Sequence, residues 1–231
     1  MRRRRAIAIF IIGTFLLAAS GAVIPEIIER AQPYIPSFNT GQTETPQPGS
    51  AAEALEALVV KGRAPKTGYS RDEFGKGWGK TLGCDTRNII LYRDLTDIQL
   101  QGECTVAVGI LQDPYTGKQI HFTRAQGAAV QIDHVIALSD AWQKGAQQLT
   151  PEQRKKLAND PLELLAVDGP ANQAKGDADA ATWLPSNKSF RCTYVARQIA
   201  VKQRYSLWVT TGEKQAMADV LKQCPEEPLP V

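Results

Sequence analysis

An aspartate and a histidine stand side by side in this chain, at Asp133-His134, directly after the β-branched residues Val130 and Ile132. A carboxylate is a hard oxygen ligand of the kind that Mg²⁺ prefers, and an imidazole is the natural base near neutral pH. Adjacent residues on an extended strand point to opposite faces, so the pair can share one reaction centre only where the strand ends. The segment therefore predicts a strand that ends at an exposed Asp-His corner.

A second segment, residues 159–177, supplies elements that could face this corner. Residues 162–167 are almost entirely apolar and predict a short strand. Residues 168–170, with the sequence Asp-Gly-Pro, predict a turn and then a helix that carries Asn172 in its first turn. Helical spacing of three places Lys175 on the same face as Asn172. The predicted order is strand, connection, strand and helix.

This order of parts resembles the ββα-metal motif of the HNH nucleases. The closer likeness is to secreted or anchored bacterial HNH endonuclease family proteins with the pattern IDHV-ALSDAW followed by NDP-LLAVDG--N--KGD, and it covers residues 63–224. We therefore expect an α+β fold, with a small antiparallel sheet and a ββα-metal catalytic core surrounded by helices.

Carried over residue by residue, the resemblance implies that His134 is the general base. It implies that Asp133 and Asn172 are the ligands of a catalytic Mg²⁺ or Mn²⁺ ion. It also implies that Asn159 is the polar residue that orients the base, and that Lys175 contacts the phosphate.

The sequence departs from the family pattern at two positions. Asp133 stands where many relatives have the first histidine, and Ala137 stands where many have proline. An aspartate keeps the role of an oxygen ligand, whereas the missing proline affects only the shape of the turn.

The function that the resemblance implies is metal-dependent hydrolysis of nucleic-acid phosphodiester bonds by a one-metal mechanism, with DNA preferred to RNA as the partner. Two alternatives remain open. One is a membrane-tethered, non-catalytic binding module that keeps the motif as a scaffold, and the other is a metal hydrolase of another phosphodiester. The intact set of Asp133, His134 and Asn172 argues against a scaffold, because an exposed base beside two ligands has no structural use.

The length of 231 residues, 43% hydrophobic and 22% charged, is typical of one catalytic domain with extensions. The net charge is +3, but Arg2 to Arg5 contribute four positive charges, which leaves residues 6–231 one unit negative. Affinity for nucleic acid must therefore come from local patches. We expect these at residues 61–93 and 187–205, where basic residues outnumber acidic ones.

The four arginines precede an apolar run, residues 6–24, which predicts a signal peptide or an N-terminal membrane anchor. Residues 25–50 predict a linker rich in proline, threonine and glutamine, residues 51–225 the nuclease domain, and residues 226–231 a tail. The protein is therefore expected to be secreted or at the cell surface, anchored by residues 6–24 if they are not cleaved. Nothing in the sequence predicts an oligomeric state.

Four cysteines are present, and no two form a Cys-x-x-Cys pair, which argues against a zinc knuckle. An even number of cysteines in a chain that begins with an export signal favours disulfides. Of the three possible pairings, the order along the chain favours Cys84–Cys104 with Cys192–Cys224. Four buried thiols are the alternative for a cytoplasmic protein.

The remaining elements follow from local patterns. We expect a helix at residues 51–60, strands at 88–95 and 104–111, and a hairpin to residues 120–123 through a turn at 113–118. Further helices should start near Ser139, after Thr150, near Cys192 with a basic outer side, and at a Thr211 cap.

Two other groups of residues have structural interpretations. His121 should lie on the surface of the hairpin, since neither sequence neighbour is a carboxylate or an amide. The aromatic residues Tyr69, Phe74 and Trp78 should anchor a basic, glycine-rich loop to the core, in preference to stacking on a nucleobase. Trp142 should pack in the core.

Overall fold

The computed structural model describes residues 47–231. By internal contacts the chain divides into two units, residues 1–43 and 44–231, and only the second is considered below. The predicted signal or anchor and most of the predicted linker lie outside the described residues. Within residues 47–231, no helix has both the length and the apolar content needed to cross a bilayer.

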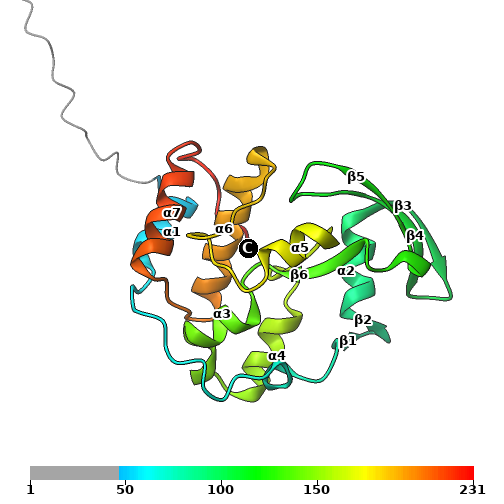
Figure 1. Cartoon of the computed structure of the whole chain (residues 1–231), viewed down its shortest axis with the longest axis horizontal. Helices are drawn as coiled ribbons and strands as arrows, with labels where there is room; N and C mark the ends of the chain where they lie inside the picture. The colour runs from blue at the N-terminus through cyan, green and yellow to red at the C-terminus, as the bar shows by residue number, and fades with distance from the viewer. Residues whose placement is uncertain (1–46) are drawn as a thin grey trace, which may run out of the picture. The chain divides into compact units, whose positions relative to one another are not determined.

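The fold is α+β, with short helices around small antiparallel sheets (Figure 1). The helices of the described part are α1 (Ala51–Ala57), α2 (Thr86–Asp94), α3 (Leu138–Gln143), α4 (Pro151–Asn159), α5 (Gly169–Lys175), α6 (Arg191–Arg204) and α7 (Thr211–Leu221). The strands are β1 (Lys80–Thr81), β2 (Cys84–Asp85), β3 (Leu95–Gln101), β4 (Thr105–Gln112), β5 (Gln119–Thr123), β6 (Val130–His134) and β7 (Leu164–Asp168).

The strands form three sheets, with the orders β1-β2, β3-β4-β5 and β6-β7. In the last sheet β6 runs antiparallel to β7, with His134 opposite Leu164 and Asp133 opposite Leu165. Helix α5 follows β7 directly, so the predicted order of two antiparallel strands and a helix is confirmed.

Local signals explain how α5 and α4 begin. The Asp168 side chain accepts a hydrogen bond from the Ala171 backbone N–H, and a proline occupies the first turn of α5. Thr150 and Gln153 form a reciprocal capping box at the start of α4. Both starts were predicted from these residues.

The two-stranded sheet β6-β7 lies between two apolar cores. Val130 and Ile132 pack in a cluster with α2 and the three-stranded sheet, together with Leu164 and Ala166 of β7. Leu165 and Val167, which alternate with them, pack in the larger cluster that includes α1, α3, α6 and α7. Both faces of β6 are therefore covered, so the side chains that point to one face are buried as well as those that point to the other.

This burial overturns the expected exposed corner. Asp133 is 6% exposed and His134 is 5% exposed, because each lies on a face of β6 that packs against a core. The strand end itself is confirmed, since β6 stops at His134.

Residues 88–95 were predicted to be a strand, which is wrong for most of that range. Asp85 caps a helix there by accepting a hydrogen bond from the Asn88 backbone N–H, and α2 continues to Asp94. The run Asn88 to Tyr92 is too short for its periodicity to distinguish a buried helix from a strand. The hairpin of β4 and β5 is confirmed, and the last helix is capped by Thr210, one residue earlier than predicted.

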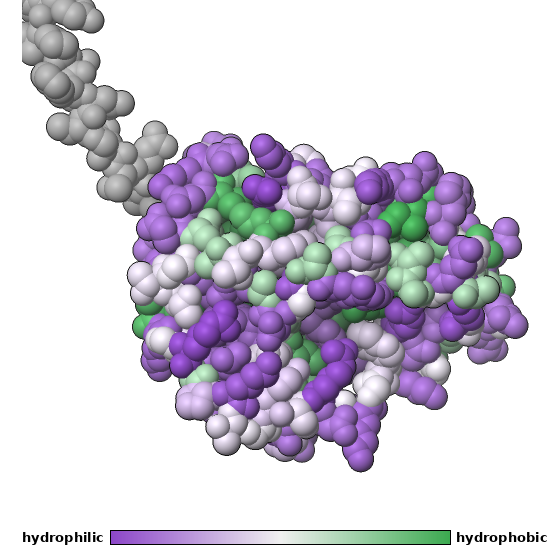
Figure 2. All heavy atoms as spheres, in the orientation of Figure 1, coloured by the Kyte–Doolittle hydropathy of each residue, from purple (hydrophilic) through white to green (hydrophobic). Residues whose placement is uncertain are grey.

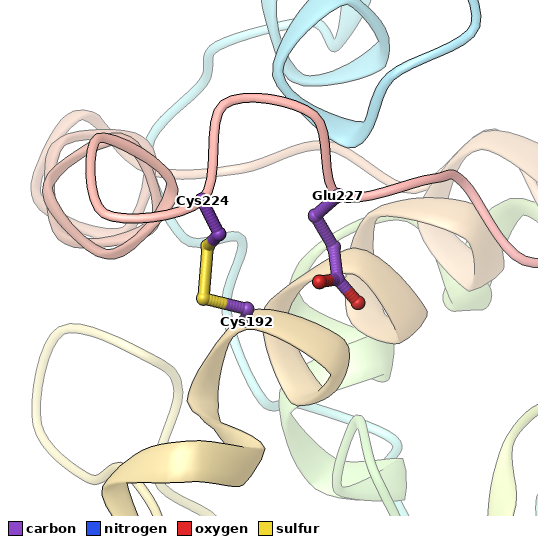
Figure 3. A group of neighbouring side chains, drawn as sticks. All are labelled: Cys192, Cys224 and Glu227. Carbon is purple, nitrogen blue, oxygen red and sulfur yellow. A yellow bond between two sulfur atoms is a disulfide. The ribbon is translucent and has the colours of Figure 1, made fainter.

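Both predicted disulfides are confirmed. Cys84–Cys104 links the start of α2 to the start of β4, and Cys192–Cys224 links the start of α6 to the end of α7 (Figure 3). The face in Figure 2 is covered mainly by hydrophilic side chains, with apolar residues in small separate groups. His121 is exposed on β5, as predicted, and Trp142 is buried in the larger core, as predicted.

Candidate active site

The imidazole of His134 is held by one backbone carbonyl. Its Nε2 lies 3.0 Å from the carbonyl oxygen of Ala158, near the end of α4. Because a carbonyl only accepts, this contact assigns the proton to Nε2 and leaves a lone pair on Nδ1. Nδ1 has no hydrogen-bond partner in residues 47–231, and Gln198 Oε1 is the one fully buried side-chain N or O atom there without a partner. Nδ1 is therefore open to solvent.

An aromatic residue covers the ring of His134. The indole of Trp78 lies parallel to the imidazole, with ring centroids 5.8 Å apart and an interplanar angle of 7°. Burial lowers the pKa of His134 to about 3, against the opposing effect of the hydrogen bond to Ala158, and the charges of Arg71 and Lys175 lower it further. The imidazole is therefore neutral at pH 7.

Asn159 was expected to orient the base, but its side chain makes other contacts. Its Oδ1 accepts hydrogen bonds from the Gly79 backbone N–H at 2.7 Å and from the Thr86 hydroxyl at 2.9 Å. The neighbouring carbonyl of Ala158 contacts the imidazole instead. Asn159 thus anchors the segment that carries Trp78, and acts on His134 only through that residue.

Asp133 is engaged by two donors from other parts of the chain. Its Oδ2 accepts a hydrogen bond from the Tyr115 hydroxyl at 2.5 Å, and its Oδ1 lies 3.0 Å from the ammonium of Lys175. Burial raises the pKa of Asp133, and the charge of Lys175 and the hydrogen bond from Tyr115 oppose that rise.

Lys175 does not occupy the position expected of a phosphate contact. Its ammonium is buried, 2% exposed as a residue, and donates to the carbonyl of His134 at 2.8 Å as well as to Asp133. A cation in these contacts is not available to a substrate. Helical spacing correctly placed Lys175 on the same face of α5 as Asn172. However, the long side chain of Lys175 reaches inward to β6.

The expected metal ligands line one hollow, and their chemistry fits a hard divalent cation. Asn172 donates its amide N–H to Gln131 Oε1 at 2.9 Å, and its side-chain oxygen Oδ1 accepts no hydrogen bond from the described residues. An ionised carboxylate has about four lone-pair sites, and Asp133 uses two of them within the protein. Oxygen donors of these types are what Mg²⁺ and Mn²⁺ prefer. These residues fit such a cation by the type of their oxygen atoms and not by their net charge, because Lys175 already balances the charge of Asp133.

One other group of possible ligands occurs in the described residues, at Cys192, Cys224 and Glu227 (Figure 3). The two sulfur atoms are joined in a disulfide. A metal binds a thiolate, so this group is not a metal centre.

Two hollows meet at His134. The smaller, about 160 Å³, lies against the glycine-rich segment and is lined by Arg71, Asp72, Phe74, Gly75, Gly77, Trp78, His134, Leu138 and Ala158. The larger, about 470 Å³, contains the polar side chains of the site, including Arg71, Arg87, Gln131, Asp133, His134, Asn172 and Asp177. His134, Arg71 and Leu138 line both.

A second acidic group lies buried behind the site. Glu163 is fully buried, and its carboxyl accepts only the Ile136 backbone N–H, at 3.3 Å. Burial raises the pKa of Glu163 well above its ordinary value, Lys175 opposes this rise, and Asp133 adds to it. Because Asp133 holds the direct contact with Lys175, Glu163 is the carboxyl that keeps a proton.

The predicted basic outer side of α6 is wrong at Lys202, and most of its other cations are engaged within the protein. Lys202 is fully buried and pairs with Glu213 of α7 at 3.0 Å. Arg197 donates to backbone carbonyls of the connection between α4 and β7, and Arg204 pairs with Asp160 there. These cations hold the fold together, whereas Lys188 is exposed.

The patch at residues 61–93 divides in a similar way. Arg63 bridges Asp140 and Asp179, and Arg93 pairs with Asp94, but Arg71 makes no ion pair within the described residues. The aromatic residues behave as expected at Phe74 and Tyr69, which pack on Trp142. Trp78 packs against the smaller core, as expected, and in addition lies on the imidazole of the proposed general base, His134.

Several residues of the site were not identified from the sequence. Gln131 lies two positions before Asp133 on one strand, so the period of a strand could have placed it on the same face. The carbonyl of Ala158 is a backbone group and has no residue-type signal. Trp78 is far from His134 in the chain, and only the packing of the glycine-rich segment brings them together.

Comparison with known proteins supports a nuclease family. Residues 86–220 match the model of a family described as GmrSD restriction endonucleases, C-terminal domain. An "Uncharacterized secreted protein" of Arthroderma benhamiae (strain ATCC MYA-4681 / CBS 112371) is 40% identical over 195 residues, which cover 83% of this chain and 88% of that protein. The family match spans β6, β7 and α5, and therefore every residue predicted for the site.

Proposed function

This chain belongs to the family of GmrSD restriction endonuclease C-terminal domains, and from that membership we propose that it is an extracytoplasmic endonuclease. It hydrolyses phosphodiester bonds of nucleic acid with His134 as the general base and with Mg²⁺ or Mn²⁺ as the cofactor. The observation that carries the proposal is that His134, whose Nδ1 has no hydrogen-bond partner within residues 47–231, lines the same polar hollow as Asp133 and Asn172. The HNH class and its bacterial type stay predictions from the motif residues.

The imidazole would take a proton from water. With Nε2–H donating to Ala158, the lone pair of Nδ1 accepts the proton while the water oxygen attacks phosphorus and the leaving oxygen departs. A bound phosphodiester places a negative charge beside the ring, which favours the imidazolium and raises the pKa of His134 from its low value in the free protein. The base therefore becomes stronger when the substrate is present.

Asp133 and Asn172 would hold the cation through their oxygens. When bound, the cation would stabilise negative charge on the phosphate and on the leaving oxygen. Tyr115 and Lys175 fix the carboxylate of Asp133, which lines the hollow and keeps lone pairs that these two contacts do not use.

The location outside the cytoplasm is supported by the two disulfides, which persist in oxidising compartments, and by the secreted relative. The preference for DNA over RNA, and the anchoring by residues 6–24, belong to the proposal as predictions. A hydrolase of another phosphodiester remains the alternative, because the base and the ligands recognise only the diester.

The test is incubation of the purified domain with plasmid DNA, linear DNA and RNA, with Mg²⁺, with Mn²⁺ and with a chelator. His134→Ala should lower the cleavage rate by a factor of about 10² to 10⁴, as expected for a lost general base. His121→Ala is the matched control, because His121 is the other histidine and is exposed on β5. Full activity of the His134 variant would remove that residue from the mechanism.

The metal ligands are tested in the same assay. Asp133→Asn and Asn172→Ala should lower activity in a way that a higher Mn²⁺ concentration partly restores, since a lost ligand weakens binding of the cation. If neither variant responds to the metal concentration, the ligand assignment is wrong.

A further inference from the structure

Lys175 is buried, so the site needs another cation for the phosphate, and two arginines without an ion pair line its larger hollow. Among the described arginines, ion pairs are formed by Arg63, Arg93, Arg154 and Arg204. Arg71 and Arg87 form none within residues 47–231, and both line the larger hollow. Two unpaired guanidinium groups at one hollow indicate a site for an anion.

The acidic residues of that hollow are already neutralised. Asp133 is paired with Lys175, and Asp177 pairs with Lys66 at 3.2 Å and accepts a hydrogen bond from Ser139. The charge left without a partner is therefore positive. An anionic ligand would complement it, whereas an uncharged ligand would leave both guanidinium groups unpaired.

The position of Arg71 points to the reacting phosphate. Arg71 is exposed on the 3₁₀ helix Arg71–Phe74, makes no side-chain hydrogen bond within the described residues, and lines both hollows together with His134. A phosphate at the junction of the hollows would contact the guanidinium and the open Nδ1 of the base together. A chain of nucleotides could then continue into the hollow on either side.

Arg87 lies farther along the larger hollow, on α2. Its guanidinium donates to the carbonyls of Val130 at 3.2 Å and Gly127 at 3.5 Å, which orient it without neutralising it. Burial lowers the pKa of Arg87, and the charge of Arg124 lowers it further. A phosphate here would relieve that repulsion.

We propose that Arg71 and Arg87 form a two-phosphate subsite, in which Arg71 contacts the scissile phosphate and Arg87 contacts a neighbouring phosphate of the same strand. Arg71 then supplies the charge stabilisation in the transition state that the sequence pattern assigned to Lys175. Arg87 contributes to binding. The inference rests on the proposed phosphodiester chemistry and names the groups that recognise it.

Binding is tested without catalysis, with dimethyl phosphate as a minimal phosphodiester. In ¹⁵N-histidine-labelled protein the two imidazoles are resolved by NMR, and the ring signals of His134 should shift with saturation while those of His121 stay unchanged. Arg71→Gln should weaken this binding about tenfold, because it loses a charged hydrogen bond, and Arg87→Gln should leave it unchanged. A trinucleotide carries two phosphodiesters, and with a chelator present Arg87→Gln should weaken its binding about tenfold. Lys118→Gln, at an exposed lysine in the β4-β5 turn, is the control and should bind like the wild type.

Kinetics separate the two roles. Arg71→Gln should lower kcat for cleavage by about 10² to 10³, a larger effect than its effect on KM, as expected for a group that stabilises transition-state charge. Arg87→Gln should raise KM about tenfold, from the same lost charged hydrogen bond, and change kcat little. Arg87→Lys keeps the charge and should recover part of the affinity if the Gln variant is poorly folded.

The outcomes distinguish this inference from the proposed function. If the wild type cleaves nucleic acid but both Gln variants keep wild-type affinity and rate, the subsite is refuted and the nuclease stands. If the wild type cleaves no nucleic acid, while binding of dimethyl phosphate at His134 depends on Arg71 and binding of the trinucleotide depends on Arg87, the anion subsite stands and the nuclease is refuted. Absence of any shift at His134 refutes the subsite.

Discussion

The indole of Trp78 lies parallel to the imidazole of His134, with 5.8 Å between the ring centroids. This contact covers one face of the ring, while the Ala158 carbonyl holds Nε2 at the edge. The proposed base is therefore not an exposed side chain at a strand end. It is a buried, oriented residue that lines two hollows.

The first prediction follows from that contact. Trp78→Ala should raise the pKa of His134 from about 3 toward the ordinary value near 6.5, because it admits water to a ring that burial keeps neutral. The measurement is an NMR titration of the two histidines, with His121 as the internal reference. Trp78→Phe keeps an aromatic ring and should shift the pKa less. An unchanged value in the Ala variant would show that other residues bury the imidazole.

The second prediction concerns the buried ion pair of Lys175 and Asp133. Lys175→Met should destabilise the fold by about 3–5 kcal/mol, because it leaves a buried carboxylate without its cation. Urea denaturation measures the loss, and Lys118→Met is the exposed control. Adding Asp133→Asn should recover much of the stability. If the Lys175 variant is stable but binds nucleic acid more weakly, the result would instead support the expected contact between Lys175 and the phosphate.

The third prediction concerns Glu163. Its folded-state pKa lies well above the unfolded value near 4.3, so the folded protein keeps a proton that the unfolded chain releases. The resulting stability is fully present below about pH 4.3, from the unfolded pKa, and is lost as the pH rises toward the folded pKa, with a slope of up to about 1.4 kcal/mol per pH unit.

Glu163→Gln removes this titration and keeps the shape of the side chain. Its stability relative to the wild type should therefore increase as the pH rises above about 4.3, by the linkage just described. Urea denaturation at several pH values between 4 and 8 makes the comparison. Parallel pH profiles for the two proteins would mean that Glu163 is ionised in the folded state.

The fourth prediction concerns the disulfides, which close segments with separations of 20 and 32 residues. Removing either pair with alanine should cost about 3 kcal/mol of stability on chain-entropy grounds. The two losses should differ in function, because Cys84 lies beside the start of α2, which carries Arg87. Loss of Cys84–Cys104 should also weaken binding of the trinucleotide, and loss of Cys192–Cys224 should not. Equal binding by both variants would separate that disulfide from the subsite.

Local patterns in the sequence by themselves determined the order of the catalytic elements. The alternation of β6, the Asp168 cap with its proline, and the capping box at Thr150 are signals within a few residues of one another, and the structure contains all three elements. The cysteine pairing also followed from order along the chain. Such signals are readable because they depend on neighbours in the chain.

The tertiary structure decided which of those residues face a substrate. Both faces of β6 pack against cores, which buries Asp133 and His134, and the long side chain of Lys175 reaches the carboxylate beneath the strand. The local sequence around a lysine is the same whether its ammonium pairs with a buried carboxylate of the protein or with a phosphate of the substrate. The carbonyl of Ala158 and the indole of Trp78 reach His134 only through packing between distant segments, and packing at that distance is not encoded in any local period.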